Sequence, residues 1–113
     1  MYSLFAEMMI SRQKIFPAFF DLLAHGEFST RLGAMAAAEA IAEKDRGIAA
    51  RLIDPLLDRF ENQIDQIKGD ILYVMGEAGD RRIIPFLKGI ISGEYTSDVK
   101  EAAADAIDNI NAS

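Results

Sequence analysis

One short stretch, from Val74 to Leu87, most narrows the architecture that this chain can adopt. It reads V-M-G-E-A-G-D-R-R-I-I-P-F-L. Gly76 and Gly79 permit the positive φ angles that end a helix, and Asp80 is a residue type that caps the next one. The proline that follows removes a backbone hydrogen bond early in the second helix and bends it. The stretch therefore predicts two helices that meet at a tight corner.

The rest of the chain predicts further helices and no strand, because no segment alternates apolar and polar residues with a period of two. Alanine-rich segments, turn glycines and prolines mark the expected boundaries. The expected helices cover residues 2–10, 12–24, 30–44, 46–60, 64 or 65 to 78, 81–91 and 98–110. We expect residues 1–113 to form a single all-α domain.

Three of these helices repeat one pattern at intervals of about 32–35 residues, the length of a helix-pair repeat. Leu32, Ile67 and Val99 align in this register. Residue types that favour the N-cap stand two positions before each of them, at Thr30, Asp65 and Ser97. The first helix of each pair carries a proline, at Pro17, Pro55 and Pro85. The pattern predicts helix pairs over about residues 12–44, 46–78 and 80–110, preceded by a short leading helix over residues 2–10.

This pattern resembles HEAT-type helical repeats and is most similar to the short variety in phycobilisome-lyase-like proteins. The resemblance is carried by residues 75–87, M-G-E-A-G-D-R-R-I-I-P-F-L, and residues 99–107, V-K-E-A-A-A-D-A-I. It covers residues 64–110 well and the first half less well, where Gly33 replaces the basic residue that the family favours after Leu32. It implies a right-handed α-α superhelix, or α-solenoid, of about three antiparallel helix pairs, with the second helices lining the concave side.

Charge and composition narrow the functional classes. The 12 Lys and Arg residues against 18 Asp and Glu residues give a net charge of −6, which disfavours nucleic acid and anionic membranes as partners. The chain has no cysteine, hence no disulfide, thiol nucleophile or thiolate metal site. No apolar run is long enough to span a bilayer, and the first residues lack the basic lead of a signal peptide. We therefore expect a cytoplasmic protein.

Residues suited to catalysis are scarce. His25 is the single histidine and falls in a turn, where a structural role is expected. One histidine provides neither a nucleophile–base pair nor the usual zinc spacing. Gly76-x-x-Gly79 lacks the strand and the third glycine of a dinucleotide-binding loop. We expect no enzymatic activity, no metal and no cofactor.

The concave face provides the candidate binding site for a protein partner. Helical spacing places on this face Ala37, Ala38, Lys68, Leu72, Tyr73 and Asp105. Small residues would form its floor, Leu72 and Tyr73 would anchor the partner, and acidic residues would form a wall. The alternative is that the alanines reflect helix propensity and that Tyr73 covers a neighbouring helix.

Glu39 conflicts with the repeat register, which places it at a position that is apolar in the other repeats. A buried carboxylate without a partner is costly. Either its helix is rotated about its axis, which would move Ile41 inward, or Glu39 has a partner such as Arg31 or Lys68.

The N-terminal end is apolar, whereas the last helix carries a polar face. Within the first twenty residues the sequence gathers Phe5, Met9, Phe16, Phe19 and Phe20. Since the terminal repeat of a solenoid needs a polar outer face, this apolar surface has two alternatives. In the first, the leading helix folds back and covers this apolar surface. In the second, the apolar surface docks against a preceding domain or a second copy of the chain.

The favoured function is a noncatalytic protein-interaction or scaffold module that uses its concave face. The alternative is a regulatory or dimerising domain attached to an enzyme, such as a thioredoxin-like one, which the apolar N-terminal end would suit. The resemblance also implies bilin lyases and DNA glycosylases as a third class. The missing cysteine disfavours the first of these enzymes and the net charge disfavours the second.

Overall fold

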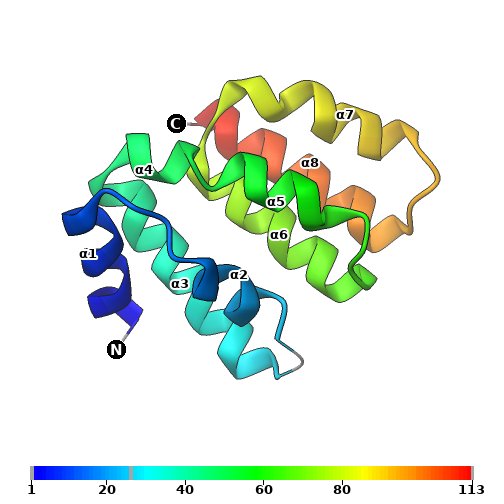
Figure 1. The fold of residues 1–113 in the computed structure, drawn as a ribbon. Helices are drawn as coiled ribbons and strands as arrows, with labels where there is room; N and C mark the ends of the chain where they lie inside the picture. The colour runs from blue at the N-terminus through cyan, green and yellow to red at the C-terminus, as the bar shows by residue number, and fades with distance from the viewer. Residues whose placement is uncertain (1, 26, 113) are drawn as a thin grey trace.

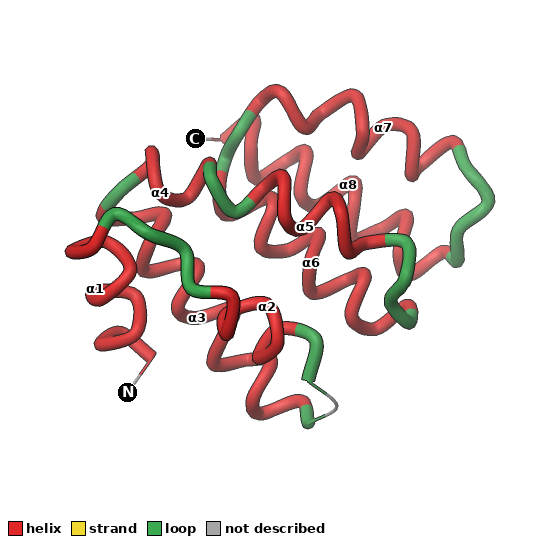
Figure 2. The backbone as a smooth tube through the Cα atoms, viewed as in Figure 1, coloured by secondary structure: helices red, strands yellow, loops and turns green. Residues whose placement is uncertain are grey.

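The computed structural model describes residues 2–25 and 27–112, with side chains from Ala6 onward in these ranges. Its elements in chain order are α1 (Tyr2–Arg12), α2 (Pro17–Leu23), α3 (Phe28–Lys44), α4 (Arg46–Ala50), α5 (Ile53–Phe60), α6 (Asp65–Ala78), the 3-10 helix η1 (Arg81–Ile83), α7 (Ile84–Ser92) and α8 (Ser97–Ala112). The described residues form helices and loops without a strand, as Figure 2 shows. The predicted all-α class is confirmed.

The three longest helices, α3, α6 and α8, lie side by side in chain order (Figure 1). In this layer α6 lies between α3 and α8 and packs against both. Shorter helices cover the layer: α1 and α2 pack on α3, α5 packs on α6, and α7 packs on α8. The main helix contacts therefore join elements that are close together in the sequence.

The corner between α6 and η1 forms as predicted. Gly79 has a φ of 71°, the left-handed conformation that glycine adopts without strain, and its N–H donates to the carbonyl of Met75 at 3.3 Å. Asp80 accepts a hydrogen bond from the backbone N–H of Arg82 at 3.0 Å. The Arg82 side chain also donates to this carboxylate, and it is the main reason that the pKa of Asp80 lies below its ordinary value.

Two of the three predicted helices that contain a proline are interrupted near it. Residues 13–16 separate α1 from α2, which begins at Pro17. Residues 46–60 divide into α4 and α5, with Pro55 in the first turn of α5, and Pro85 is the second residue of α7 after η1. Proline has no N–H to donate and its φ suits the start of a helix. The prediction that Pro17 and Pro55 lie inside continuous helices is therefore wrong, whereas Pro85 lies near the start of the helical stretch 81–92, as predicted.

The N-caps predicted from the repeat are also wrong. Thr30 lies inside α3, which begins at Phe28. Asp65 is the first residue of α6, and the preceding cap position has no side-chain hydrogen bond. Ser97 is likewise the first residue of α8, where the hydroxyl of Thr96 accepts from a backbone N–H at 3.4 Å instead.

The apolar residues near the N-terminal end are largely buried. α1 packs against α3, and Met9, Phe19 and Phe20 are buried, each with at most 6 % exposure. Gln13 ends α1 with a φ of 51°, and its side-chain amide donates to the carboxylate of Asp45 at 3.0 Å. The alternative in which these three apolar residues form an exposed docking surface is therefore wrong.

Two further residues had been assigned to that docking surface. Phe16 is half-buried and packs against the core, and the side chain of Phe5 lies outside the described residues. Among the described side chains of α1, Met8 is the large hydrophobic one that stays exposed, at 38 %. The apolar N-terminal sequence is thus largely used to close the core.

Helix α3 is rotated relative to the repeat register. Leu32, which the register aligns with the buried Ile67 and Val99, is 50 % exposed, whereas Ile41 is fully buried. Glu39 is half-buried and accepts a hydrogen bond from the hydroxyl of Tyr73. The rotation that was one of the two predicted solutions is confirmed, and the partner of Glu39 is neither of the basic residues expected.

Gly76, expected in a turn, instead allows α6 and α8 to approach closely. It is buried, and a Cβ added to it would lie 3.0 Å from the Cα of Ala106. At Gly69, two turns earlier on the same face of the helix, an added Cβ would have no neighbour within 4 Å. The two glycines of α6 therefore have different roles.

We expect opposite effects from alanine at these glycines. Gly76→Ala should lower the free energy of unfolding by about 1–2 kcal/mol, because overpacking outweighs the gain in helix propensity. Gly69→Ala should raise it by about 0.5–1 kcal/mol, since only the propensity changes. Urea denaturation measures both, and a Gly76→Ala protein more stable than the parent would contradict the close approach.

Candidate functional site

A groove runs over α6 between α3 and α8, and we call it the α6 groove. Its widest part is a cavity of about 430 Å³. The cavity is lined by Met35 of α3, by Gly69, Asp70 and Tyr73 of α6, and by Ala102, Asp105, Ala106 and Asn109 of α8. The lining residues of α6 and of α8 recur every three or four positions, so each helix presents one face to the groove. The glycine and alanine residues form the floor of the cavity, because their small side chains leave it unfilled.

Tyr73 is the aromatic residue of this cavity. Its side chain is partly exposed, and its hydroxyl donates a hydrogen bond to the carboxylate of Glu39. Burial raises the pKa of the Tyr73 hydroxyl well above its ordinary value, and the carboxylates of Glu39 and Glu77 raise it further. The phenol therefore stays protonated and fixed by its partner, while part of its ring faces the groove.

Asp70 is held in the groove wall by a buried arginine. The Nε of Arg31 donates to the Oδ2 of Asp70 at 2.8 Å, and the two side chains are 4 % and 17 % exposed. A second nitrogen of Arg31 donates to the carbonyl of His25 at 3.0 Å. Since the guanidinium has few rotamers left when buried and bonded, this carboxylate is rigidly placed.

The α6 groove continues into a narrower cavity of about 110 Å³ toward the C-terminal end of α6. It is lined by Ala42, Glu43, Arg46, Gly76, Glu77 and Asn109. The side-chain amide of Asn109, which lines both cavities, donates to the carboxylate of Glu77 at 3.1 Å. The two cavities are therefore neighbouring parts of one surface.

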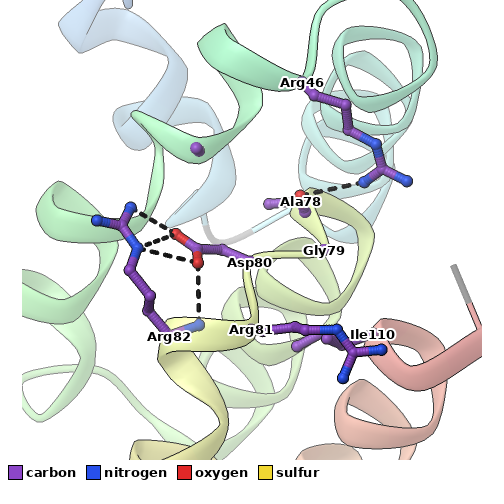
Figure 3. Close-up of a pocket in the computed structure, with 8 residues that line it drawn as sticks. Arg46, Ala78, Gly79, Asp80, Arg81, Arg82 and Ile110 are labelled. Atoms are coloured by element: carbon purple, nitrogen blue, oxygen red, sulfur yellow. Dashed lines mark hydrogen bonds and ion pairs between the residues drawn. The ribbon is translucent and has the colours of Figure 1, made fainter.

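Three arginines surround a further cavity of about 440 Å³ at the end of α6 (Figure 3). Arg46, which also lines the narrow cavity, donates to a carbonyl at the C-terminus of α6 at 3.2 Å. Arg81 donates to the side chain of Asn111 at 3.2 Å, and Arg82 is held by Asp80 at 2.7 Å. We call Arg46, Arg81 and Arg82 the arginine corner, which is a positively charged end to an otherwise acidic groove.

The predicted binding residues divide into three groups. Tyr73 and Asp105 line the groove, on α6 and α8. The expectation of an exposed position is wrong for three residues, which are buried at 2 % exposure or less: Ala37, Ala38 and Leu72. Lys68 is half-buried on another face of α6, with its Nζ 5.7 Å from the ring centroid of Phe60 and 5.5 Å from that of Tyr95.

Sequence reasoning missed an apolar strip on α3 that leads into the groove. Phe28 is 60 % exposed and Leu32 is 50 % exposed, and one turn further Met35 lines the cavity. Their spacing of four and three positions places them on one face of the helix, which continues to Glu39. The signal in the sequence was this spacing combined with the polar Glu39, which marks the face that turns toward solvent.

The described residues offer little for catalysis or metal binding. They contain no group of three His, Asp or Glu side chains placed to hold a metal ion. The Nδ1 of His25 accepts a hydrogen bond from the N–H of Glu27 at 3.1 Å, which is a local turn contact. Within the described part of the chain, no helix combines the length and apolarity needed to cross a membrane.

Comparisons with known proteins found no matching family model and no significant match among curated proteins or solved structures.

Proposed function

We propose that this protein is a noncatalytic protein-interaction module, built as a short α-solenoid of the HEAT type, that binds a partner protein in the α6 groove. The observation that carries the proposal is the partly exposed ring of Tyr73, set on a floor of small residues between three helices that stack in chain order. A rigid aromatic residue in a concave site of this kind is a typical anchor for a protein partner.

The polar contacts support a repeat architecture. Side-chain hydrogen bonds between distant segments join residues about one repeat apart: 39 positions for Arg31 and Asp70, 34 for Glu39 and Tyr73, and 32 for Glu77 and Asn109. These bonds link α3 to α6 and α6 to α8. In a solenoid each repeat contacts its neighbours, which produces this regular separation.

The alternative of a dimerising or enzyme-docking domain rested on an apolar N-terminal surface. Burial of Met9, Phe19 and Phe20 removes that feature. Of the surfaces that the structure describes, the α6 groove combines an exposed aromatic ring with a cavity, so we assign partner binding to it.

The proposed function is tested by site-specific photo-crosslinking in the cells from which the protein comes. A photoreactive residue at Asp105, in the groove, should crosslink a defined partner protein, whereas one at Asp58 should not. Asp58 is the matched control because it is also an exposed helical aspartate, on α5. The groove does not bind the partner if both positions capture the same products.

Tyr73→Ala should then remove the crosslink from position 105, because the anchor is lost. Its thermal unfolding should be compared with that of the parent, since the hydrogen bond to Glu39 is lost as well. A folded Tyr73→Ala protein that captures the partner at the parent level would contradict the assignment of Tyr73 as the anchor.

A further inference from the structure

The α6 groove is acidic along most of its length. Four carboxylates line its two cavities: Asp70, Asp105, Glu43 and Glu77. Among the described lining residues of these cavities the basic one is Arg46, at the far end. The guanidinium of Arg31 lies beneath the wall, 4 % exposed and paired with Asp70. A partner that enters the groove therefore meets negative charge on both sides.

The groove also has an apolar side. The strip of Phe28, Leu32 and Met35 on α3 leads to the ring of Tyr73 and to Ala102 on α8. Two strongly exposed large apolar residues one turn apart are unusual on a free helix face, and they indicate a surface that a partner covers. The occupant must then be apolar on one side and basic on the other.

The walls of the groove are helices, whose backbone groups are already hydrogen-bonded within each helix. They offer no sheet edge to which an extended peptide could add as a strand. An α-helix, which satisfies its own backbone hydrogen bonds and presents side chains on every face, suits a groove of this kind. Along α6 the groove extends from Gly69 to Gly79, about 15 Å, which accommodates about ten residues of a partner helix.

We propose that the α6 groove binds a basic amphipathic helix of the partner protein, with the C-terminal end of that helix at the arginine corner. This inference rests on the proposed function and adds the chemistry and the direction of the partner. Apolar residues of the helix would pack on Leu32, Met35 and Tyr73. Its Lys and Arg side chains would pair with Asp105 and Glu77 on the rim.

The charge at the two ends of the groove determines the direction in which the partner helix binds. The C-terminal end of a helix carries partial negative charge on its free carbonyl groups. Arg81 and Arg82 are exposed guanidinium groups at the arginine corner, with donors that a carbonyl or carboxylate can use. The partly positive N-terminal end of the helix is placed at the acidic end, near Asp70 and Asp105.

A synthetic peptide of about 14 residues, with Leu on one helical face and Lys on the other, is the probe. A peptide of the same composition in scrambled order and one with Glu in place of Lys are its controls. In a titration of the ¹⁵N-labelled protein followed by NMR, the amphipathic basic peptide should shift the amide signals of Gly69, Tyr73, Ala102 and Asn109 and reach saturation. Both control peptides should bind at least tenfold more weakly.

Two matched pairs of variants separate groove binding from general attraction to an acidic protein. Asp105→Lys should weaken peptide binding at least tenfold, whereas Asp58→Lys, which changes the net charge equally, should change it less than twofold. Gly69→Leu should block the groove, whereas Gly89→Leu on α7 should not. An added Cβ has no neighbour within 4 Å at either glycine, so both variants are expected to fold.

The direction is tested with a spin label on either end of the peptide. A label at the C-terminal end should broaden the amide signals of Arg81 and Arg82, and a label at the N-terminal end should broaden those around Asp70. The reverse pattern would overturn the proposed direction.

The remaining outcomes separate this inference from the proposed function. If the acidic peptide shifts the same groove residues as strongly, or if the shifts spread evenly over α5 and α7, the basic helix is the wrong occupant. If Gly69→Leu leaves the partner crosslink at position 105 unchanged, the proposed function itself fails.

Discussion

Asp70→Ala should lower the free energy of unfolding by about 3 kcal/mol, because it leaves the buried guanidinium of Arg31 without its charged partner. The exposed fraction of the Arg31 side chain is 4 %, so its guanidinium has lost most of its hydration in the folded protein and depends on its protein partners. The hydrogen bond to the carbonyl of His25 remains and keeps the expected loss at the low end of the range for buried pairs. Urea denaturation at neutral pH measures the change.

Removing the arginine instead of the aspartate should lower the free energy of unfolding by less. Arg31→Met leaves Asp70, whose side chain is 17 % exposed and borders the groove, in contact with solvent. We expect a loss of about 1–2 kcal/mol for this variant, and a smaller loss for Arg31→Met combined with Asp70→Leu than for Asp70→Ala alone. Asp105→Ala, at an exposed site in the same groove, should stay within about 0.5 kcal/mol of the parent. A cost below about 1 kcal/mol for Asp70→Ala would show that the ion pair is not a buried one.

This asymmetry determines which acidic residue can report on binding. Asp70 belongs both to the groove and to the packing of α3 against α6, so its replacement changes the fold as well as the surface. Asp105 is exposed on α8 and can be changed without that effect. A loss of partner binding at Asp105 therefore reports on the groove, whereas the same loss at Asp70 does not separate the two causes.

The parts of the fold that could be predicted are those with a single local cause. Gly79 and Asp80 define the corner after α6 because left-handed backbone and an open helix N-terminus each favour one residue type. The C-terminal bound of α6 follows from this corner. The prolines were harder to place, because a proline is compatible with both the first turn of a helix and a bend within it.

The register of α3 could not be predicted from its hydrophobic pattern. Alanine, which dominates this helix, fits a core or a surface equally well, so the helix has almost no apolar face to orient it. The repeat alignment then placed Leu32 inward, and the structure places it outward at 50 % exposure. Arg31, with a long aliphatic stem and a charged partner 39 positions away, is buried in its place. Such a partner cannot be identified from local sequence.

In the candidate site, the sequence likewise could not decide which of two adjacent residues faces the groove. Consecutive residues of a helix point about 100° apart, so Leu72 lies in the core while Tyr73 lines the groove. Lys68 and Gly69 separate in the same way. The prediction that Leu72 and Tyr73 share the exposed face is therefore right for Tyr73 alone, and for the adjacent pair Ala37 and Ala38, which are both buried, it is wrong for both.

Phe19→Asp should have the largest effect on stability, above about 4 kcal/mol, because it buries a carboxylate in the core between α2 and α3. Phe19 is fully buried, and its ring packs edge to face on Phe20 with centroids 5.3 Å apart. Phe19→Leu is the milder variant, and it should fold with a smaller loss. Circular dichroism during thermal unfolding measures both losses, and a Phe19→Asp protein as stable as the parent would contradict the burial of this ring.

The region that unfolds in Phe19→Asp tests the repeat architecture. In a solenoid each unit is stabilised by its own core and by its neighbours, so damage at one end need not reach the other. We expect hydrogen exchange to show lost protection in α1, α2 and α3 and retained protection in α8. Leu87→Asp, at a fully buried position of α7, should do the reverse and expose α7 and α8 first. If both variants lose protection along the whole described chain together, the helices form one cooperative core, and the proposal of stacked repeats is wrong even though the α6 groove is present.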